Sequence, residues 1–221
     1  MVLDFTVASF FGLVLINGVA IVIFVWAVVK APWSLIFEVS LRQNLLLGSI
    51  FGLTIFWLMD FALTPLVIIH PIMITSVVLM VGLRFCLLVG AIASAVYCAF
   101  SVIDMLNVAG HFLLNVACPA TFIWGSNRWL RSKNPSNLFF YTLGLGFIGS
   151  ALTIPLVGTI GTGLSYCLDI ALVSEGTSLQ FEWILLAMFP EAFINGVIVS
   201  SITVFYPEWM KTFDEEYFLS K

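Results

Sequence analysis

Long apolar runs alternate with short polar turns along almost the whole chain. Seven runs are each about long enough to cross a hydrocarbon core, which takes about 20 helical residues. They lie near residues 5–29, 44–59, 61–82, 85–103, 105–125, 138–166 and 181–206. The second is short, and Pro71 interrupts the third, because proline lacks a backbone N–H and disfavours helical geometry in the residue before it. The pattern predicts an all-α polytopic membrane bundle of about seven transmembrane helices, or six if the third is broken.

The basic residues give an independent test of this count. Positive residues accumulate in short cytoplasmic loops and orient the helices between them. With the N-terminus outside, seven crossings place on the inner side every basic residue of the chain, namely Lys30, Arg42, Arg84, Arg128, Arg131, Lys133, Lys211 and Lys221. The opposite ends carry Asp4, Asp60, Asp104, Asp169 and Glu175. The sequence therefore predicts an N-out, C-in topology.

Composition excludes several other classes of protein. The chain has 221 residues, 62% of them hydrophobic and 9% charged, against about 25% charged in soluble domains. No segment is left for a soluble domain, so we expect one integral membrane domain over residues 1–221. No basic patch exceeds what topology explains, which argues against nucleic-acid binding. The motifs H-E-x-x-H, G-x-S-x-G and G-x-x-x-x-G-K-[ST] are missing, so we expect neither an enzyme nor an ATP-hydrolysing subunit.

His70 and His111 are the first candidates for chemistry inside the membrane. Ionisable side chains in membrane helices usually face the bundle interior and mark pathways or sites. At about 1.5 Å per residue, the two histidines lie about 12 and 9 Å below the outer ends of their runs, and therefore at similar depth. Neutral imidazole suits nickel, cobalt, copper and zinc, with Asn115, Met73 and Met105 as possible neighbours. Alternatively, each histidine forms only an interhelical hydrogen bond.

Glu191 and Asn195 form a second polar pair, one helical turn apart in the last run. Glu191 lies about 15 Å from the outer end, near the midplane, and Asn17 of the first run lies at about 18 Å. We expect the pair to fasten the first and last helices together by hydrogen bonds. The alternative is that Glu191 lies on an ion path or gates it.

Several motifs carry a family resemblance. Near the C-terminus these are PEAFING at 190–196, YPEW at 206–209 and TFDEEYFL at 212–219, and the segment VIIHPIMITSVVLMVG occupies 67–82. Together they resemble the CbiM/NikM-type membrane components of energy-coupling-factor cobalt and nickel transporters, most closely a poorly characterised bacterial permease branch. The likeness covers 188–219 most closely and 66–119 less closely.

This resemblance implies a metal-uptake permease or substrate-specificity component in the bacterial cytoplasmic membrane. Ni²⁺ or Co²⁺ would be its substrate, with no tightly bound cofactor, and its partners would be a transmembrane scaffold and ATPase subunits. The family holds its metal with the N-terminal amine, a histidine at position two and a later histidine, which His70 matches through its H-x-x-x-x-S/T segment. The chain begins MVLDF, without the second-position histidine, and His111 would substitute for it. The same departure supports the alternative of a non-transporting accessory or assembly subunit that keeps the fold.

Overall fold

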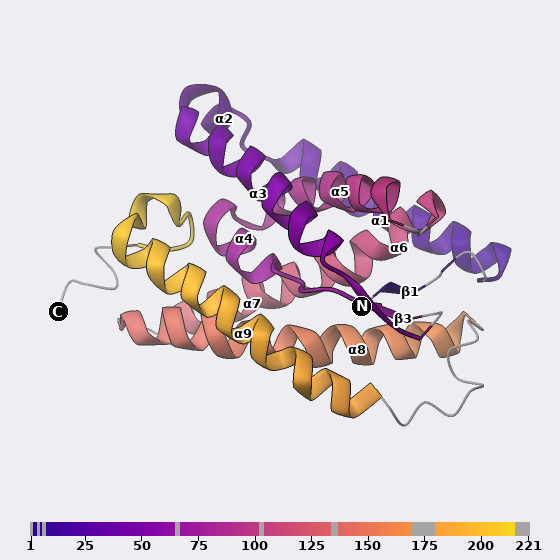
Figure 1. Ribbon diagram of the computed structural model, residues 1–221. Helices are drawn as coiled ribbons and strands as arrows, with labels where there is room; N and C mark the ends of the chain where they lie inside the picture. The colour runs from indigo at the N-terminus through magenta and orange to yellow at the C-terminus, as the bar shows by residue number, and fades with distance from the viewer. Residues whose placement is uncertain are drawn as a thin grey trace.

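The computed structural model describes residues 2–3, 5, 8–64, 67–101, 104–133, 137–168 and 180–214, of which 2–3, 61–64, 67–69 and 180–183 are described by their backbone only. Within these residues, six helical runs are long and apolar enough to cross a membrane (Figure 1). They are α1 (Phe10–Lys30), α3 (Ser40–Leu58), α5 (Leu83–Phe100), the run Met105–Ser132, the run Phe140–Cys167, and α9 (Gln180–Phe205). The prediction of an all-α polytopic bundle is confirmed.

Two of the runs are composite helices. Met105–Ser132 joins the 3-10 turn η2 (Met105–Asn107), α6 (Val108–Phe112), the π-helical η3 (Leu113–Ala117) and α7 (Cys118–Ser132). Phe140–Cys167 joins the π-helical η4 (Phe140–Gly149) to α8 (Ser150–Cys167). Pro119 explains the π-helical segment η3. Its nitrogen cannot donate to the carbonyl one turn earlier, and a π-helical turn lets the helix continue past this missing hydrogen bond. Two short elements, α2 (Ser34–Glu38) and η6 (Pro207–Trp209), lie at helix ends.

The third expected span is interrupted, as Pro71 indicated, but its first half is extended and not helical. Its first half forms the strands β2 (Phe61–Thr64) and β3 (Val67–Ile69), and only α4 (Ile74–Val81) is helical. Prolines 65 and 71 remove backbone donors, and the β-branched residues between them favour extended structure. β3 is the central strand of a small antiparallel sheet of order β1-β3-β2, in which β1 (Val2–Leu3) pairs Val2 with Ile68. The segment nevertheless runs from one end of the bundle to the other. Asp60, just before the segment, bonds Tyr97 near the end of α5, and Gly82, just after α4, directly precedes the start of α5.

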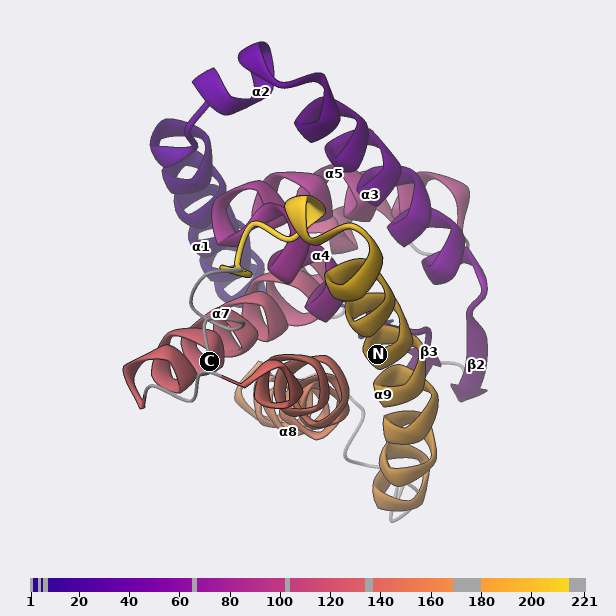
Figure 2. The same ribbon diagram turned by 90° about the vertical axis from the view of Figure 1, so that its left-hand side faces the viewer.

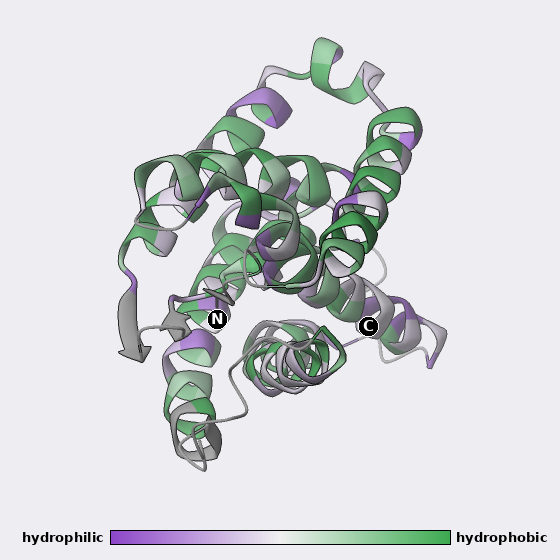
Figure 3. Ribbon diagram, turned by 90° about the vertical axis from the view of Figure 1, so that its right-hand side faces the viewer, coloured by the Kyte–Doolittle hydropathy of each residue, from purple (hydrophilic) through white to green (hydrophobic). Residues whose placement is uncertain are grey.

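α4 lies in the middle of the molecule. It contacts α3, α5, α7 and α9, which surround it (Figure 2). All of its residues except Met80 are buried, whereas α1, α3 and α9 expose many large apolar side chains to the outside. The long helices are coloured mainly as hydrophobic (Figure 3), as expected for faces that contact lipid. The helical part of the interrupted crossing, α4, is therefore shielded from lipid by the helices around it.

Basic and acidic residues lie at opposite ends of the bundle. At one end, called here the basic end, Arg84 Nη1 donates to the Lys30 carbonyl at 2.8 Å and Arg42 Nη1 to the Trp209 carbonyl at 3.3 Å. Asp60 lies at the other end, as does Asp104, which caps the start of the run Met105–Ser132. The arrangement agrees with the predicted grouping of basic residues. Which compartment each end faces stays a prediction.

Candidate metal site at the interrupted crossing

The interruption brings the two histidines together. His70 follows β3 at the point where the chain leaves the sheet, and His111 lies in α6. Both side chains are 1% exposed, and their Nε2 atoms are 3.2 Å apart. The sequence predicted a similar depth for this pair, and the structure adds direct contact.

A hydrogen-bond chain fixes the orientation of both imidazoles. His70 Nδ1 lies 3.0 Å from the Pro71 carbonyl, which can only accept, so His70 carries its proton on Nδ1. Its Nε2 therefore accepts the Nε2–H of His111. His111 Nδ1 in turn accepts from the Ser94 hydroxyl at 3.0 Å. The network assigns one proton to each ring, and each ring nitrogen has a partner.

Two aromatic side chains form walls around the histidine pair. The Trp57 ring lies 4.8 Å from that of His111, edge to face, and 5.5 Å from that of His70. Tyr97 lies 5.0 Å from His111 and 5.5 Å from His70. Their polar atoms bond elsewhere: Trp57 Nε1 donates to the Ile72 carbonyl at 3.1 Å, and the Tyr97 hydroxyl to Asp60 Oδ2 at 2.6 Å. The aromatic faces therefore hold the imidazoles in an enclosed apolar setting.

The two Nε2 atoms are the ligands that this site can offer to a metal ion. Among the described residues, no group of three or more histidine, cysteine or acidic side chains forms such a site. Shifting the His111 proton to Nδ1 would free both Nε2 lone pairs, because the Ser94 hydroxyl can also accept. Each Nδ1–H would then donate to an oxygen, the arrangement typical of metal-bound histidines.

The expected neighbours of the histidines lie in different places. Met105 is 54% exposed at the end of the bundle, so it does not contribute sulfur to a buried site. Met73 Sδ accepts from Asn195 Nδ2 at 3.6 Å and belongs to the second polar pair. Asn115 is fully buried in the π-helical turn after His111.

Glu191 and Asn195 bind the backbone at the start of α4. Glu191 Oε2 accepts from the Ile72 N–H and Oε1 from the Met73 N–H, both at 2.8 Å. Asn195 Oδ1 accepts from the Ser76 N–H at 3.0 Å and from its hydroxyl at 2.7 Å, and Asn195 Nδ2 donates to Glu191 Oε1 at 2.8 Å. The first N–H groups of a helix have no partner within it, so α9 supplies their acceptors.

These bonds also hold an unusual backbone conformation. Met73 has φ of 59°, in the left-handed region that a methionine rarely adopts. Its N–H is one of the two that Glu191 accepts. The carboxyl group therefore stabilises the sharp turn that directs the chain from His70 into α4.

The expected contact of this pair with the first helix is not observed. Asn17 is exposed and donates to the carbonyl of Leu13 in its own helix. Glu191 and Asn195 bond instead to the interrupted crossing, because its unpaired N–H groups need acceptors inside the bundle. The side chain of Glu182, another acidic residue of the last run, lies outside the described side chains.

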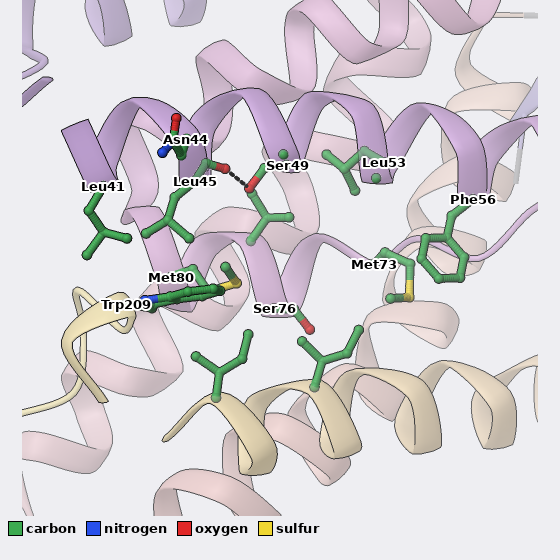
Figure 4. A pocket seen from close by; sticks show the side chains of 15 residues that line it. Leu41, Asn44, Leu45, Ser49, Leu53, Phe56, Met73, Ser76, Met80 and Trp209 are labelled. Atoms are coloured by element: carbon green, nitrogen blue, oxygen red, sulfur yellow. Dashed lines mark hydrogen bonds between the residues drawn. The ribbon is translucent and has the colours of Figure 1, made fainter. Parts of the chain in front are cut away.

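An apolar groove lies beside Glu191 and Asn195. It has a volume of about 420 Å³ and lies between α3, α4 and α9, with Met73 and Ser76 in its wall (Figure 4). Leu45, Leu53 and Phe56 are among its apolar lining residues, and the Ser49 hydroxyl there donates to the Leu45 carbonyl. Its lining contains no ionisable side chain.

The N-terminal segment packs against the helix that carries His111, which the sequence did not predict. The first long helix begins at Phe10 with Ser9 as its cap, so residues 5–9 of the expected span are not part of it. Phe5 N–H donates to Asn107 Oδ1 at 2.6 Å, and the Phe5 ring covers Gly110, where a Cβ would come within 2.2 Å of it. β1 runs antiparallel to β3, which directs the start of the chain toward His70. Met1, whose amine the resemblance points to, lies outside the described residues.

Comparisons with known proteins give no further information about this site. No protein-family model, no curated protein and no solved structure matches the chain. The resemblance to cobalt and nickel transporters is therefore a prediction from motifs alone. The contacts of the two buried polar pairs therefore carry the functional proposal.

Proposed function

We propose that this protein binds a transition-metal ion between His70 and His111 and acts as the membrane substrate-binding component of a metal-uptake transporter. The observation that carries this proposal is the pair of buried Nε2 atoms 3.2 Å apart in the interrupted crossing. Broken helices near the middle of a bundle often border substrate sites in transporters. Non-helical backbone at that depth is tolerated only where protein or a cavity surrounds it.

The ligand chemistry favours a borderline divalent metal. Imidazole nitrogen suits nickel, cobalt, copper and zinc, and the motif resemblance selects Ni²⁺ or Co²⁺ as the substrate. The Pro71 carbonyl and the Ser94 hydroxyl would orient the two rings, as outer partners of metal-bound histidines do.

Thr75 supplies a further polar atom in this segment. Its hydroxyl is buried and has no hydrogen-bond partner among the described residues, five residues after His70 in the H-x-x-x-x-S/T segment. Buried polar groups are nearly always paired, so an unpaired hydroxyl indicates a missing water molecule or ligand. We propose that a water molecule carried with the metal bonds to it.

Energy for transport would come from other subunits. The chain contains no phosphate-binding motif for ATP, so ATPase subunits and a transmembrane scaffold are its proposed partners. The proposed location is the bacterial cytoplasmic membrane, with the basic end inside.

Metal content of the purified protein tests this proposal. Protein would be purified in mild detergent from cells supplied with nickel, cobalt, copper and zinc, and analysed by elemental mass spectrometry. We expect near-stoichiometric metal in the wild type and near-complete loss in His70→Ala and His111→Ala. Ser94→Ala should weaken affinity by about 10- to 100-fold, because it removes a partner that orients His111.

Cys167→Ser is the matched control for surface binding of metal. This thiol is free and exposed, and its loss should leave the metal content unchanged. Monodisperse elution of each variant would show that it is folded. Absence of metal from the wild type, or its retention in both histidine variants, would refute the proposed site.

A second candidate function also has an observation in its favour. The chain from Ser94 through both histidines to Pro71 is complete without a metal ion, as a purely structural contact would be. The protein would then be a non-transporting accessory or assembly subunit. Co-purification separates the two: ATPase subunits favour transport, and a different membrane complex favours the accessory role.

A further inference from the structure

A large cavity at the basic end is lined by residues from four separate parts of the chain. Its volume is about 670 Å³. The end of α1, the start of α5, α7 and the segment after η6 contribute Trp26, Pro32, Gly82, Leu83, Arg84, Trp124, Asn127, Arg128, Arg131, Lys211 and Thr212. The positive-inside rule explains why cations lie at this end, but it does not require four of them to converge on one cavity.

The contacts of three of these cations are with neutral groups. Arg84 Nη1 donates to the Lys30 carbonyl, the Arg128 guanidinium lies 5.6 Å from the centre of the Trp124 ring, and Lys211 Nζ lies 5.2 Å from that of Phe85. The fourth, Arg131, donates to the Thr212 carbonyl at 2.8 Å. The positive charges of Arg84, Arg128 and Lys211 therefore add up around the cavity. The exposed Asp214, close in sequence to Thr212, contributes one opposing charge.

The environment of Lys211 shows the effect of this charge. Partial burial, together with the charges of Arg42 and Arg84, lowers the pKa of its ammonium group below the usual value. A bound anion would relieve the repulsion among these residues. The backbone of this segment is anchored, because Lys211 N–H donates to the Met80 carbonyl at 3.0 Å and Thr212 N–H to that of Leu79 at 3.2 Å.

Two further features indicate what kind of anion fits. Trp26 and Trp124 are partly exposed in the cavity wall, and tryptophan is enriched at the level of lipid headgroups. Asn127 is 7% exposed, and its Oδ1 is a buried acceptor that finds no partner in the part of the chain that the structure describes. The cavity thus combines guanidinium donors suited to phosphate with an acceptor for a hydroxyl group.

We propose that this cavity binds a phosphate group, supplied by the headgroup of an anionic phospholipid such as phosphatidylglycerol. Arg84, Arg128 and Lys211 contact the phosphate, and Asn127 accepts from a headgroup hydroxyl. Basic pockets between helices at the cytoplasmic side bind anionic headgroups in this way. The bound lipid holds the C-terminal segment against α5 and α7.

Native mass spectrometry of the full-length protein in detergent tests the proposal. In this experiment, phosphatidylglycerol and phosphatidylcholine would be added at equal concentration. In a separate experiment, inorganic phosphate would be added at millimolar concentration and thermal unfolding would be measured. We expect preferential binding of phosphatidylglycerol, weakened about fivefold by each of Arg84→Gln and Arg128→Gln. Lys133→Gln is the matched control, since Lys133 directly follows α7 at the same end of the bundle but does not line the cavity.

The outcomes separate the source of the phosphate from the existence of the site. A phosphatidylglycerol preference that is lost in the arginine variants and kept in Lys133→Gln supports the lipid. Equal binding of both lipids, with stabilisation by inorganic phosphate that needs the arginines, supports the phosphate site with a soluble source. No preference in either arm, or an equal loss in Lys133→Gln, would overturn the proposal.

Discussion

Two buried polar pairs meet at the interrupted crossing and differ in what they bond. His70 and His111 bond to each other, and only one nitrogen of the pair contacts backbone. Glu191 and Asn195 accept from three backbone N–H groups at the start of α4. The first pair can therefore exchange its central hydrogen bond for a metal ion while the backbone keeps its partners. The second cannot release its bonds without exposing unpaired N–H groups.

This difference in bonding distinguishes the proposed metal site, His70 and His111, from the pair that stabilises the backbone beside it, Glu191 and Asn195. Side chains that bond mainly to one another are available for ligand chemistry, whereas side chains that satisfy backbone define the local fold. Glu191 accepts from the Met73 N–H, only three residues after His70. The loss of Glu191 should therefore also disturb the position of His70.

Glu191→Ala should destabilise the protein most. It leaves the Ile72 and Met73 N–H groups buried without acceptors, at about 1–3 kcal/mol each, so we expect a loss of about 2–6 kcal/mol in the free energy of unfolding. Denaturant unfolding in mixed micelles would measure it. A variant as stable as wild type that has lost metal uptake would instead place Glu191 on the ion path.

Two asparagines provide a matched control for this effect. Asn195→Ala should cost about 1 kcal/mol, in the range measured for polar contacts between membrane helices. Asn17→Ala removes an exposed amide with only a local bond and should change stability by less than about 0.5 kcal/mol. Equal effects of the two substitutions would show that the contact between α9 and α4 is not what stabilises the bundle.

Gly110→Ala should disturb the histidine site from its other side. The new Cβ would overlap the Phe5 ring and displace the N-terminal segment from the helix next to His111, at a cost of about 1–3 kcal/mol. Metal content should fall together with thermal stability. Gly125→Ala is the control, because its added Cβ would meet no described atom within 4 Å beyond the neighbouring backbone of its own helix, and it should stabilise the helix by up to about 1 kcal/mol.

Thr75→Val should have the smallest effect and the opposite sign. The substitution keeps the shape and removes a buried hydroxyl without a partner, so the metal-free protein should be stabilised by about 1 kcal/mol or less. Metal affinity should fall if the hydroxyl binds a water molecule carried by the ion. Thermal unfolding with and without metal measures the stability of the metal-free protein and the affinity for the metal. An unchanged affinity would show that Thr75 is not part of the proposed site.

Much of this organisation could be predicted from the sequence because the bilayer imposes strong rules. The length of apolar runs and the positions of basic residues are local properties, and lipid allows little besides helices to satisfy the backbone. The depth of His70 and His111 followed from counting residues. The break in the third run was indicated by Pro71, although not the strands that replace its first half.

Only the tertiary structure decided which polar groups meet. Glu191 pairs with the start of α4 and not with Asn17, because the orphan N–H groups of a broken helix needed acceptors, and no local pattern shows which helix supplies them. The same holds for Ser94 and Tyr97, whose places beside His111 depend on how α5 and α6 pack. Sequence by itself determined the membrane class, the long helices and the two polar pairs. Packing of distant segments, which depends on the whole bundle at once, brought the two histidines into contact and placed Glu191 and Asn195 on the turn that follows His70.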